Sequence, residues 1–166
     1  MKAVKQMLSS QKDFKDMISI FNEEEVEFMV IGGMAVMIHG YVRATKDLDL
    51  WVWANSENSI RVIKALEKFG APMDSISAAD FEQEGVIFQI GVEPIRIDII
   101  TAPAGIKFEE VYPNIQIVEI DGLKIPLISI PDLIKNKKAT GRSQDLTDVK
   151  HLERILKLKS QSSAPK

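Results

Sequence analysis

The segment FMVIGGMAVMIHGYVRATKDLDLWVW, residues 28–53, limits what this chain can fold into more than any other part of the sequence. It combines an apolar run, the pair Gly32-Gly33, a short stretch of helical character and a second apolar run that carries Asp47 and Asp49. Side chains two residues apart on an extended strand point to the same face. We therefore expect both carboxylates on one face of a strand, with the apolar residues between them on the other.

Two neighbouring carboxylates repel each other unless a positive charge lies between them. A hard divalent cation with oxygen ligands, Mg²⁺ or alternatively Mn²⁺, suits such a pair. Gly32 and Gly33 precede a short helix, and exposed backbone amides at a helix N-terminus suit a phosphate group. The segment therefore predicts a site for metal and phosphate together, which indicates nucleotide chemistry.

Length and composition place few limits beyond this. With 166 residues, 45% hydrophobic and 27% charged, we expect a single domain over residues 1–159 and a disordered tail over residues 160–166. The chain has no cysteine, which excludes disulfide bonds and thiolate zinc sites and fits a cytoplasmic protein. We find no signal peptide, and no apolar run approaches the roughly 18 residues of a membrane span.

The charges are distributed unevenly along the chain. Residues 1–121 contain 11 Lys and Arg against 20 Asp and Glu, whereas residues 122–166 contain 10 against 4. The acidic part contains the predicted metal site, and the basic part is suited to face phosphates, RNA included. The alternative is that these charges only keep helix faces in contact with water.

The hydrophobic periodicity predicts a mixed α/β (α+β) fold, in which helices pack on a mixed sheet. A capping box at Ser10 and Asp13 predicts the start of the first helix. Asp121-Gly122 predicts a tight hairpin turn. The expected helices cover about residues 10–25, 34–39, 55–69, 131–140 and 143–158, and the expected strands cover 27–31, 47–53, 86–90, 95–101, 115–120 and 123–128.

Asp98 is a candidate third carboxylate. It shares the polar face of its strand with Arg96, and this strand could lie beside the one that carries the Asp47/Asp49 pair. A carboxylate there could complete a metal cluster or accept a proton from an attacking hydroxyl. The alternative is a polar row that faces solvent.

Helix phase singles out two residues near the C-terminus. At 100° per residue, Asp145 falls on the apolar stripe of its helix, and a carboxylate on a buried arc needs a partner. Lys137, on the apolar side of the preceding helix, is the candidate partner. The alternative is that Asp145, close to the start of its helix, only satisfies the helix dipole.

Other polar and aromatic residues near the glycine pair have open roles. Arg43 and Thr45 lie in the loop just before the Asp47/Asp49 pair, where an arginine can clamp phosphate or simply be exposed. We expect a structural role for His39 rather than a catalytic one. Trp51 and Trp53 share the face of the two aspartates, where they could stack on a base, although tryptophans on strands more often pack in a core.

These residues resemble a known family. Gly32-Gly33, 13 residues and then Asp47-Leu48-Asp49 resembles the signature of the nucleotidyltransferase superfamily, whose relatives include DNA polymerase β. The Asp98 of RIDIIT matches the family's third carboxylate. The stretch DLIKNKKATGRSQDLTDVKHLE resembles the C-terminal helical motif of small AbiEii-type toxins and their tRNA-modifying relatives, in which a Lys and an Asp belong to the active site. Lys137 and Asp145 are the matching positions.

The resemblance implies an Mg²⁺-dependent enzyme that moves a nucleoside monophosphate from a nucleoside triphosphate such as ATP to an acceptor hydroxyl and releases pyrophosphate. It implies that Asp47, Asp49 and Asp98 bind metal and that Lys137 neutralises phosphate, oriented by Asp145. Gly32 and Gly33 would approach the phosphates, with Arg43 and Thr45 beside them. The acceptor stays open between tRNA, a protein hydroxyl and a small molecule, and many relatives carry a further acceptor domain for which this chain is too short.

Two other readings of the sequence stay open at this point. The first is a catalytically silent protein that binds a nucleotide, such as a toxin–antitoxin regulator with a cognate antitoxin. The three neighbouring carboxylates argue against it, because a protein without catalysis does not need a cluster of acids that repel each other. A plain interaction domain with solvated acids is the remaining reading.

Overall fold

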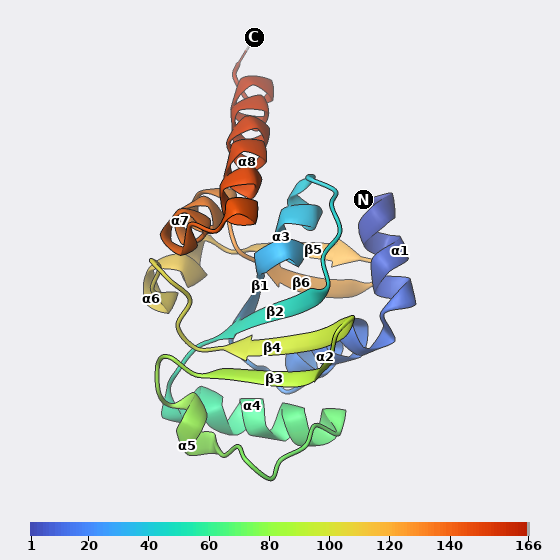
Figure 1. Ribbon diagram of the computed structural model, residues 1–166, viewed down its shortest axis with the longest axis vertical. Helices are drawn as coiled ribbons and strands as arrows, with labels where there is room; N and C mark the ends of the chain where they lie inside the picture. Colours follow the sequence, from blue (N-terminus) through green and yellow to red (C-terminus); the bar gives the residue numbers. More distant parts are fainter. Residues whose placement is uncertain (166) are drawn as a thin grey trace.

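The computed structural model describes residues 1–165, in which helices alternate with single strands or pairs of strands (Figure 1). The helices are α1 (Lys2–Ser10), α2 (Lys12–Glu23), α3 (Gly32–His39), α4 (Ser56–Phe69), α5 (Ala78–Phe81), α6 (Phe108–Val111), the 3-10 turn η1 (Tyr112–Asn114), α7 (Ile130–Thr140) and α8 (Ser143–Ser162). The strands are β1 (Phe28–Ile31), β2 (Asp47–Val52), β3 (Ile87–Val92), β4 (Ile95–Ile100), β5 (Gln116–Ile120) and β6 (Leu123–Leu127).

All six strands form one mixed sheet in the order β3-β4-β2-β1-β6-β5. The pairs β1–β2, β3–β4 and β5–β6 are antiparallel, whereas β2–β4 and β1–β6 are parallel. The mixed α/β class expected from the sequence is therefore confirmed. The sheet order places β2 beside β4, although α4, α5 and β3 separate them in sequence.

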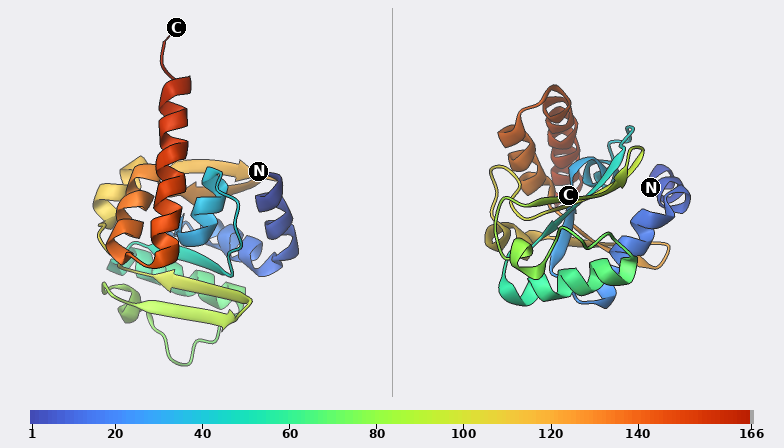
Figure 2. Two further views of the ribbon diagram at one scale, coloured as in Figure 1. Left: turned by 45° about the horizontal axis from the view of Figure 1, so that its top comes forward. Right: turned by 60° about the horizontal axis from the view of Figure 1, so that its bottom comes forward.

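Helices cover both faces of the sheet (Figures 1 and 2). On one side α2 packs against α4 and β6, and on the other α3 contacts β1, β2, α7 and α8. The far end of α8 projects well beyond the rest of the molecule and ends near the C-terminus (Figure 1). The start of α8 therefore belongs to the body of the protein, beside α3 and α7.

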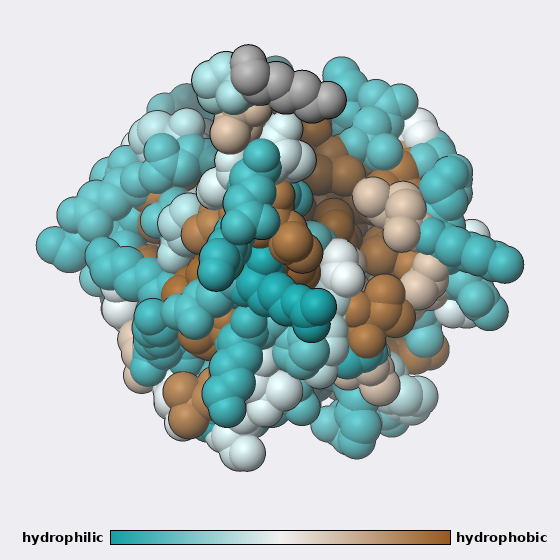
Figure 3. All heavy atoms as spheres, turned by 90° about the horizontal axis from the view of Figure 1, so that it is seen from above, coloured by the Kyte–Doolittle hydropathy of each residue, from teal (hydrophilic) through white to brown (hydrophobic). Residues whose placement is uncertain are grey.

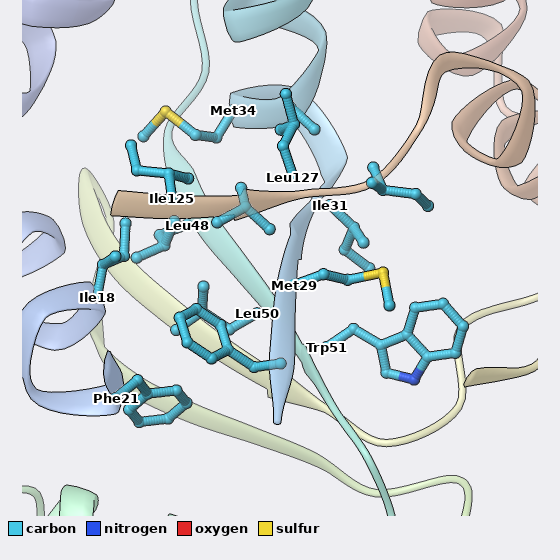
Figure 4. Packing of buried hydrophobic residues seen from close by; sticks show 14 of the residues in the cluster. Ile18, Phe21, Met29, Ile31, Met34, Leu48, Leu50, Trp51, Ile125 and Leu127 are labelled. Carbon is cyan, nitrogen blue, oxygen red and sulfur yellow. The ribbon is translucent and has the colours of Figure 1, made fainter. Parts of the chain in front are cut away.

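The apolar residues of β1 and β2 form the centre of the core (Figure 4). Ile18 and Phe21 of α2 face Leu50, whereas Trp51 turns to the opposite side of β2, as the alternation of a strand requires (Figure 4). Burying a side chain of this size contributes about 1.5–3 kcal/mol to folding. This packing surrounds β2 with buried side chains, and β2 carries two of the candidate site residues.

Several boundaries differ from the expectation. The helix predicted over residues 10–25 corresponds to α2, and α1 before it was not predicted. The predicted capping box is wrong, because Gln11 precedes α2 without a side-chain cap and Ser10 instead donates to the carbonyl oxygen of Met7 at 2.9 Å. Asn55 caps α4, since its side chain accepts a hydrogen bond from the Asn58 amide. The helix α8 continues to Ser162, into the segment expected as a tail, and residue 166 lies outside the described residues.

The face seen along the projecting end of α8 is hollowed (Figure 3). Hydrophobic residues line the hollow beside the helix, and hydrophilic residues surround it (Figure 3). Within residues 1–165, no helix is both long enough and apolar enough to cross a bilayer.

Candidate functional site

The three predicted acids lie on two adjacent strands. The parallel register of β2 and β4 pairs Asp49 with Asp98 and Asp47 with Arg96. Paired residues on adjacent strands project from the same face, so the carboxylates of Asp49 and Asp98 are neighbours. The predicted juxtaposition of Asp98 with the Asp47/Asp49 pair is thus found in the structure.

A cation already bridges two of these acids. The Arg96 guanidinium donates from Nη2 to Asp47 Oδ2 at 2.8 Å and from Nε to Asp98 Oδ1 at 2.9 Å. A second bond runs from Nη2 to Asp98 Oδ2 at 3.2 Å. The sequence placed Arg96 only in a polar row, because its contact with Asp47 depends on the register between strands. Among residues 1–165, no three acidic or histidine side chains form a group that could hold a metal as they stand.

Asp49 is partly buried between the other two acids, and within residues 1–165 it has no hydrogen-bond or ion-pair partner to offset that burial. Burial, and after it the charges of Asp98 and Asp47, raise the pKa of its carboxyl to about 7, against the opposing effect of Lys137. A carboxylate in this position gains stability from any added positive charge. The electrostatics of Asp49 therefore favour a cation in the cleft.

Gly32 and Gly33 allow the chain to approach this acid closely. Gly32 has φ +68°, and a Cβ built on it would lie 2.1 Å from Asp49 Oδ2. A Cβ on Gly33 would lie 2.5 Å from the Thr45 hydroxyl oxygen. Both glycines begin α3, where the first backbone amides of the helix lack partners within the helix. The absence of side chains thus brings these amides, Asp49 and Thr45 to one place.

The acids suit a hard divalent cation in their chemistry. Asp47 Oδ1 is buried without a hydrogen-bond partner. Asp49 and Asp98 add further carboxylate oxygens nearby, and oxygen atoms of this kind are the ligands that Mg²⁺ prefers. The glycine at position 32 leaves the space that a side chain would fill beside Asp49. The residues therefore fit such an ion, once Arg96 releases Asp47 and Asp98. Their metal-binding role stays a prediction.

The helices α7 and α8 supply the second part of the site. Lys137 Nζ lies 3.2 Å from Asp145 Oδ1, so the pairing expected from helix phase is present, and it lies 2.8 Å from Asp148 Oδ2. Burial would raise the pKa of Asp145, but bonds from Arg142, Thr140 and Lys137 lower it to about 2. The carboxylate is therefore ionised and holds the buried Lys137 ammonium in place.

Asp148 is a site residue that the sequence analysis missed. Its side chain is 0% exposed and accepts from Arg43 Nε and Nη2, each at 2.8 Å, and from Gln144 at 3.0 Å. Arg43 is 18% exposed, so of the two alternatives for this loop arginine, simple exposure does not hold. Helix phase contains a signal for Asp148, since it lies three residues after Asp145 and next to the apolar stripe.

One cavity of about 680 Å³ joins these parts. Its volume lies within the range of small-molecule sites. All of the predicted site residues line it, and so do Arg96 and Arg142: Gly32, Gly33, Arg43, Thr45, Asp47, Asp49, Asp98, Lys137 and Asp145. The structure therefore brings together residues from four separate parts of the chain. Asp47, Asp49 and Asp98 form the acidic end of the cavity, and Lys137 and Arg142 form its basic end.

The aromatic and histidine candidates lie elsewhere. Trp51 is 1% exposed, donates to the Thr101 carbonyl at 3.1 Å and packs on Phe108, so it belongs to the core. Trp53 stacks on Phe108 as well. His39 is buried, and its Nε2 lies 2.7 Å from the Ile128 carbonyl, which supports the structural role expected for it.

Comparison with known proteins decides the family. The family model described as "Nucleotidyltransferase of unknown function (DUF6036)" matches residues 6–159. The chain belongs to this nucleotidyltransferase family. The superfamily resemblance read from the glycine pair and the acids is thereby confirmed, whereas the AbiEii-type subgroup stays a prediction. A search of the curated proteins gave no match.

Solved structures resemble the nucleotidyltransferase in fold. The lincosamide antibiotic adenylyltransferase LnuA, solved with lincomycin bound, is 18% identical with a TM-score of 0.60, over 87% of this chain and 97% of LnuA. The antibiotic-resistance factor ANT(2'')-Ia is 14% identical with a TM-score of 0.59, over 92% and 90%. A nucleotidyltransferase-like protein from Paracoccidioides brasiliensis is 14% identical with a TM-score of 0.55, over 95% and 77%. At these identities the likeness concerns the fold.

Proposed function

We propose that the nucleotidyltransferase transfers a nucleoside monophosphate from a nucleoside triphosphate to an acceptor hydroxyl in an Mg²⁺-dependent reaction. The observation that carries the proposal is the shared cavity, in which Asp47, Asp49 and Asp98 face the glycine pair and Lys137. The acceptor oxygen forms a bond to the α-phosphorus while the bond from that phosphorus to pyrophosphate breaks. The acceptor proton passes to a carboxylate, and pyrophosphate leaves.

Residues at the two ends of the cavity have different roles, metal binding at one end and phosphate binding at the other. Asp47, Asp49 and Asp98 would hold the divalent ion, which when bound neutralises charge on the phosphates. Asp98 also accepts the proton of the acceptor hydroxyl. At the other end, Lys137 neutralises phosphate charge while Asp145 keeps its ammonium in position. Positioned charges of this kind accelerate the reaction without a nucleophilic side chain.

Gly32 and Gly33 present their amides to the β and γ phosphates, which suits the N-terminus of α3. Arg43 and Thr45 lie next to them on the cavity wall. Arg43 acts mainly by fixing this loop to α8 through Asp148, because two of its nitrogens are already bonded there. This gives Arg43 a positioning part beside the phosphates.

The acceptor is a hydroxyl compound whose class the proposal leaves to experiment. LnuA and ANT(2'')-Ia make antibiotics reasonable acceptors to test. The basic residues of the C-terminal third support tRNA, and the predicted subgroup supports tRNA, a protein hydroxyl or a cognate antitoxin as partner.

The test uses radioactive ATP, CTP, GTP and UTP labelled at either the α- or the γ-phosphate, with Mg²⁺. Each is incubated with tRNA, a protein extract, lincomycin and an aminoglycoside. Nucleotidyl transfer moves the α label to one acceptor class and leaves the γ label in pyrophosphate. Asp49→Ala abolishes the transfer, whereas Asp74→Asn, which removes an exposed carboxylate, does not.

A second variant separates binding from turnover. We expect Asp98→Asn to retain most of the nucleotide affinity, measured as a ligand-induced rise in melting temperature, while turnover collapses. Binding without any transfer across the panel would favour the silent regulatory protein instead. Neither binding nor transfer with any triphosphate would refute the proposal.

A further inference from the structure

Arg96 occupies the place in the site where an added cation would act. Its guanidinium contacts Asp47 at 2.8 Å and Asp98 at 2.9 Å, and within residues 1–165 neither acid forms another ion pair. Its side chain is 27% exposed, so water reaches the bridge. The bridge therefore offsets the repulsion between acids while leaving Arg96 able to move.

The bridge uses the oxygens that a divalent ion would need. Both oxygens of Asp98 and one oxygen of Asp47 accept bonds from Arg96. Of the four carboxylate oxygens of Asp47 and Asp98, the buried Oδ1 of Asp47 is the one without a partner in the described part of the chain. A divalent ion that binds Asp47 and Asp98 must therefore displace the guanidinium, or at least take from it the oxygens that it holds.

The surroundings of Arg96 offer space and other anionic partners to a displaced guanidinium. Arg96 pairs across the strands with Gly91, which has no side chain to block movement toward the β3 edge of the sheet. The carboxylate of Glu93, in the turn between β3 and β4, attracts the Arg96 guanidinium, although it also forms an exposed ion pair with Lys46 at 3.3 Å. Arg96 also lines the same cavity as Lys137 and Arg142, so phosphate oxygens in that cavity are a second anionic partner.

We propose that Arg96 is a positioning residue that holds Asp47 and Asp98 in the metal-free protein and is displaced when the divalent ion enters with the triphosphate. This inference rests on the proposed function. Because a triphosphate brings negative charge that can receive the guanidinium, its binding lowers the cost of displacing Arg96. The ion and the nucleotide therefore bind with positive coupling, and each strengthens the other.

The first test measures Mn²⁺ binding without nucleotide, by electron paramagnetic resonance of free Mn²⁺. We compare the wild type, Arg96→Gln and Arg61→Gln, a control that removes the same charge from an ion pair outside the cavity. Arg96→Gln is expected to bind Mn²⁺ at least tenfold more tightly than the wild type, and Arg61→Gln to bind like the wild type. A merely structural role for Arg96 predicts the opposite, because the acids would lose their arrangement.

The second test adds an ATP analogue with a methylene bridge between the α and β phosphates. In the wild type the analogue is expected to strengthen Mn²⁺ binding at least tenfold, and in Arg96→Gln by clearly less, because the bridge is already gone. Equal strengthening in both proteins, or Mn²⁺ binding by Arg96→Gln that is no tighter than wild type, would overturn the role of Arg96.

A separate measurement covers the case in which Arg96→Gln does not fold. If Arg96→Gln unfolds without metal, Mn²⁺ should restore its melting temperature, whereas the wild type shows a smaller rise. Arg96→Lys keeps the charge but lacks the two-point fork, and we expect it to bind Mn²⁺ with intermediate affinity. If no protein binds Mn²⁺ even with the analogue present, the proposed function fails. Mn²⁺–nucleotide binding that is the same in all variants refutes only the part assigned to Arg96.

Discussion

Arg43 and Asp148, which lie 105 residues apart in the sequence, form a two-point ion pair with both nitrogen–oxygen distances at 2.8 Å. The pair ties the loop before β2 to the first turns of α8. The same carboxylate lies 2.8 Å from Lys137 of α7. One buried aspartate thus joins three segments at the basic end of the cavity.

Replacing this aspartate is expected to leave two cations without their shared partner. Asp148→Asn should lower the free energy of unfolding by about 3–5 kcal/mol, because an uncompensated charge then stays buried. The measurement is urea denaturation at pH 7. Glu153→Gln, which breaks the exposed pair with Lys138 across the same two helices, should cost only about 0–1 kcal/mol. Equal losses of unfolding free energy in the two variants would show that the Asp148 ion pairs contribute no more to stability than an exposed pair.

Gly32→Ala, compared with Gly70→Ala, is expected to separate the stability cost of a positive φ from the effect of a side chain that enters the site. Gly32 and Gly70 both have positive φ, so alanine at either position costs on the order of 1–2 kcal/mol. At Gly70 a Cβ meets nothing within 4 Å, whereas at Gly32 it meets Asp49 Oδ2 at 2.1 Å. Only Gly32→Ala should therefore abolish the rise in melting temperature that Mg²⁺ and a triphosphate produce. A full rise in that variant would contradict the close approach of glycine and acid.

Much of the site was predictable from sequence because it depends on local periodicity. Strand alternation placed Asp47 and Asp49 on one face, and helix phase paired Lys137 with Asp145. The resemblance then added Asp98 with more weight than its spacing alone carried. In each case the geometry follows from the residues of one or two neighbouring elements.

The remainder depended on contacts between distant segments. The bridge by Arg96 follows from the register of β2 against β4, and the partner of Asp148 comes from a loop far away in the chain. Among the elements, α5 and α6 have four residues each, which is too short for a hydrophobic period to show. The helix α1 was not predicted, because only Val4 and Leu8 of its nine residues are buried, which is too few to show a helical period.

The buried carboxyl of Asp49 should make stability depend on pH in metal-free buffer. Its pKa is about 7 in the folded protein, against 3.8 as the ordinary value, so the folded state holds a proton that the unfolded state releases. The contribution of Asp49 to stability is therefore greatest below pH 4 and is lost as pH rises through 7. Asp49→Asn should remove this loss and be more stable than the wild type at pH 8.

Urea denaturation in EDTA between pH 5 and pH 8 measures the effect. As pH rises from 5 toward 7, the stability advantage of Asp49→Asn over the wild type should grow by up to about 1.4 kcal/mol for each pH unit, and it should level off above pH 7. Asp74→Asn, at an exposed carboxylate, controls for the change in net charge. A difference that does not change with pH would mean that Asp49 stays ionised throughout.

Asp145 should show the opposite dependence at acid pH. Burial opposes its ionisation, but Arg142 and Lys137 lower the pKa of its carboxyl to about 2, below the ordinary value of 3.8. The unfolded state then takes up a proton first as pH falls, so the stabilisation is complete above about pH 4 and is lost between 4 and 2. The shift corresponds to on the order of 2 kcal/mol. Asp145→Asn should therefore be less stable at pH 6 but lose less on acidification, which urea midpoints at pH 6, 4 and 3 measure. If the wild type and Asp145→Asn lose the same stability between pH 6 and pH 3, the Lys137 contact does not hold Asp145 ionised.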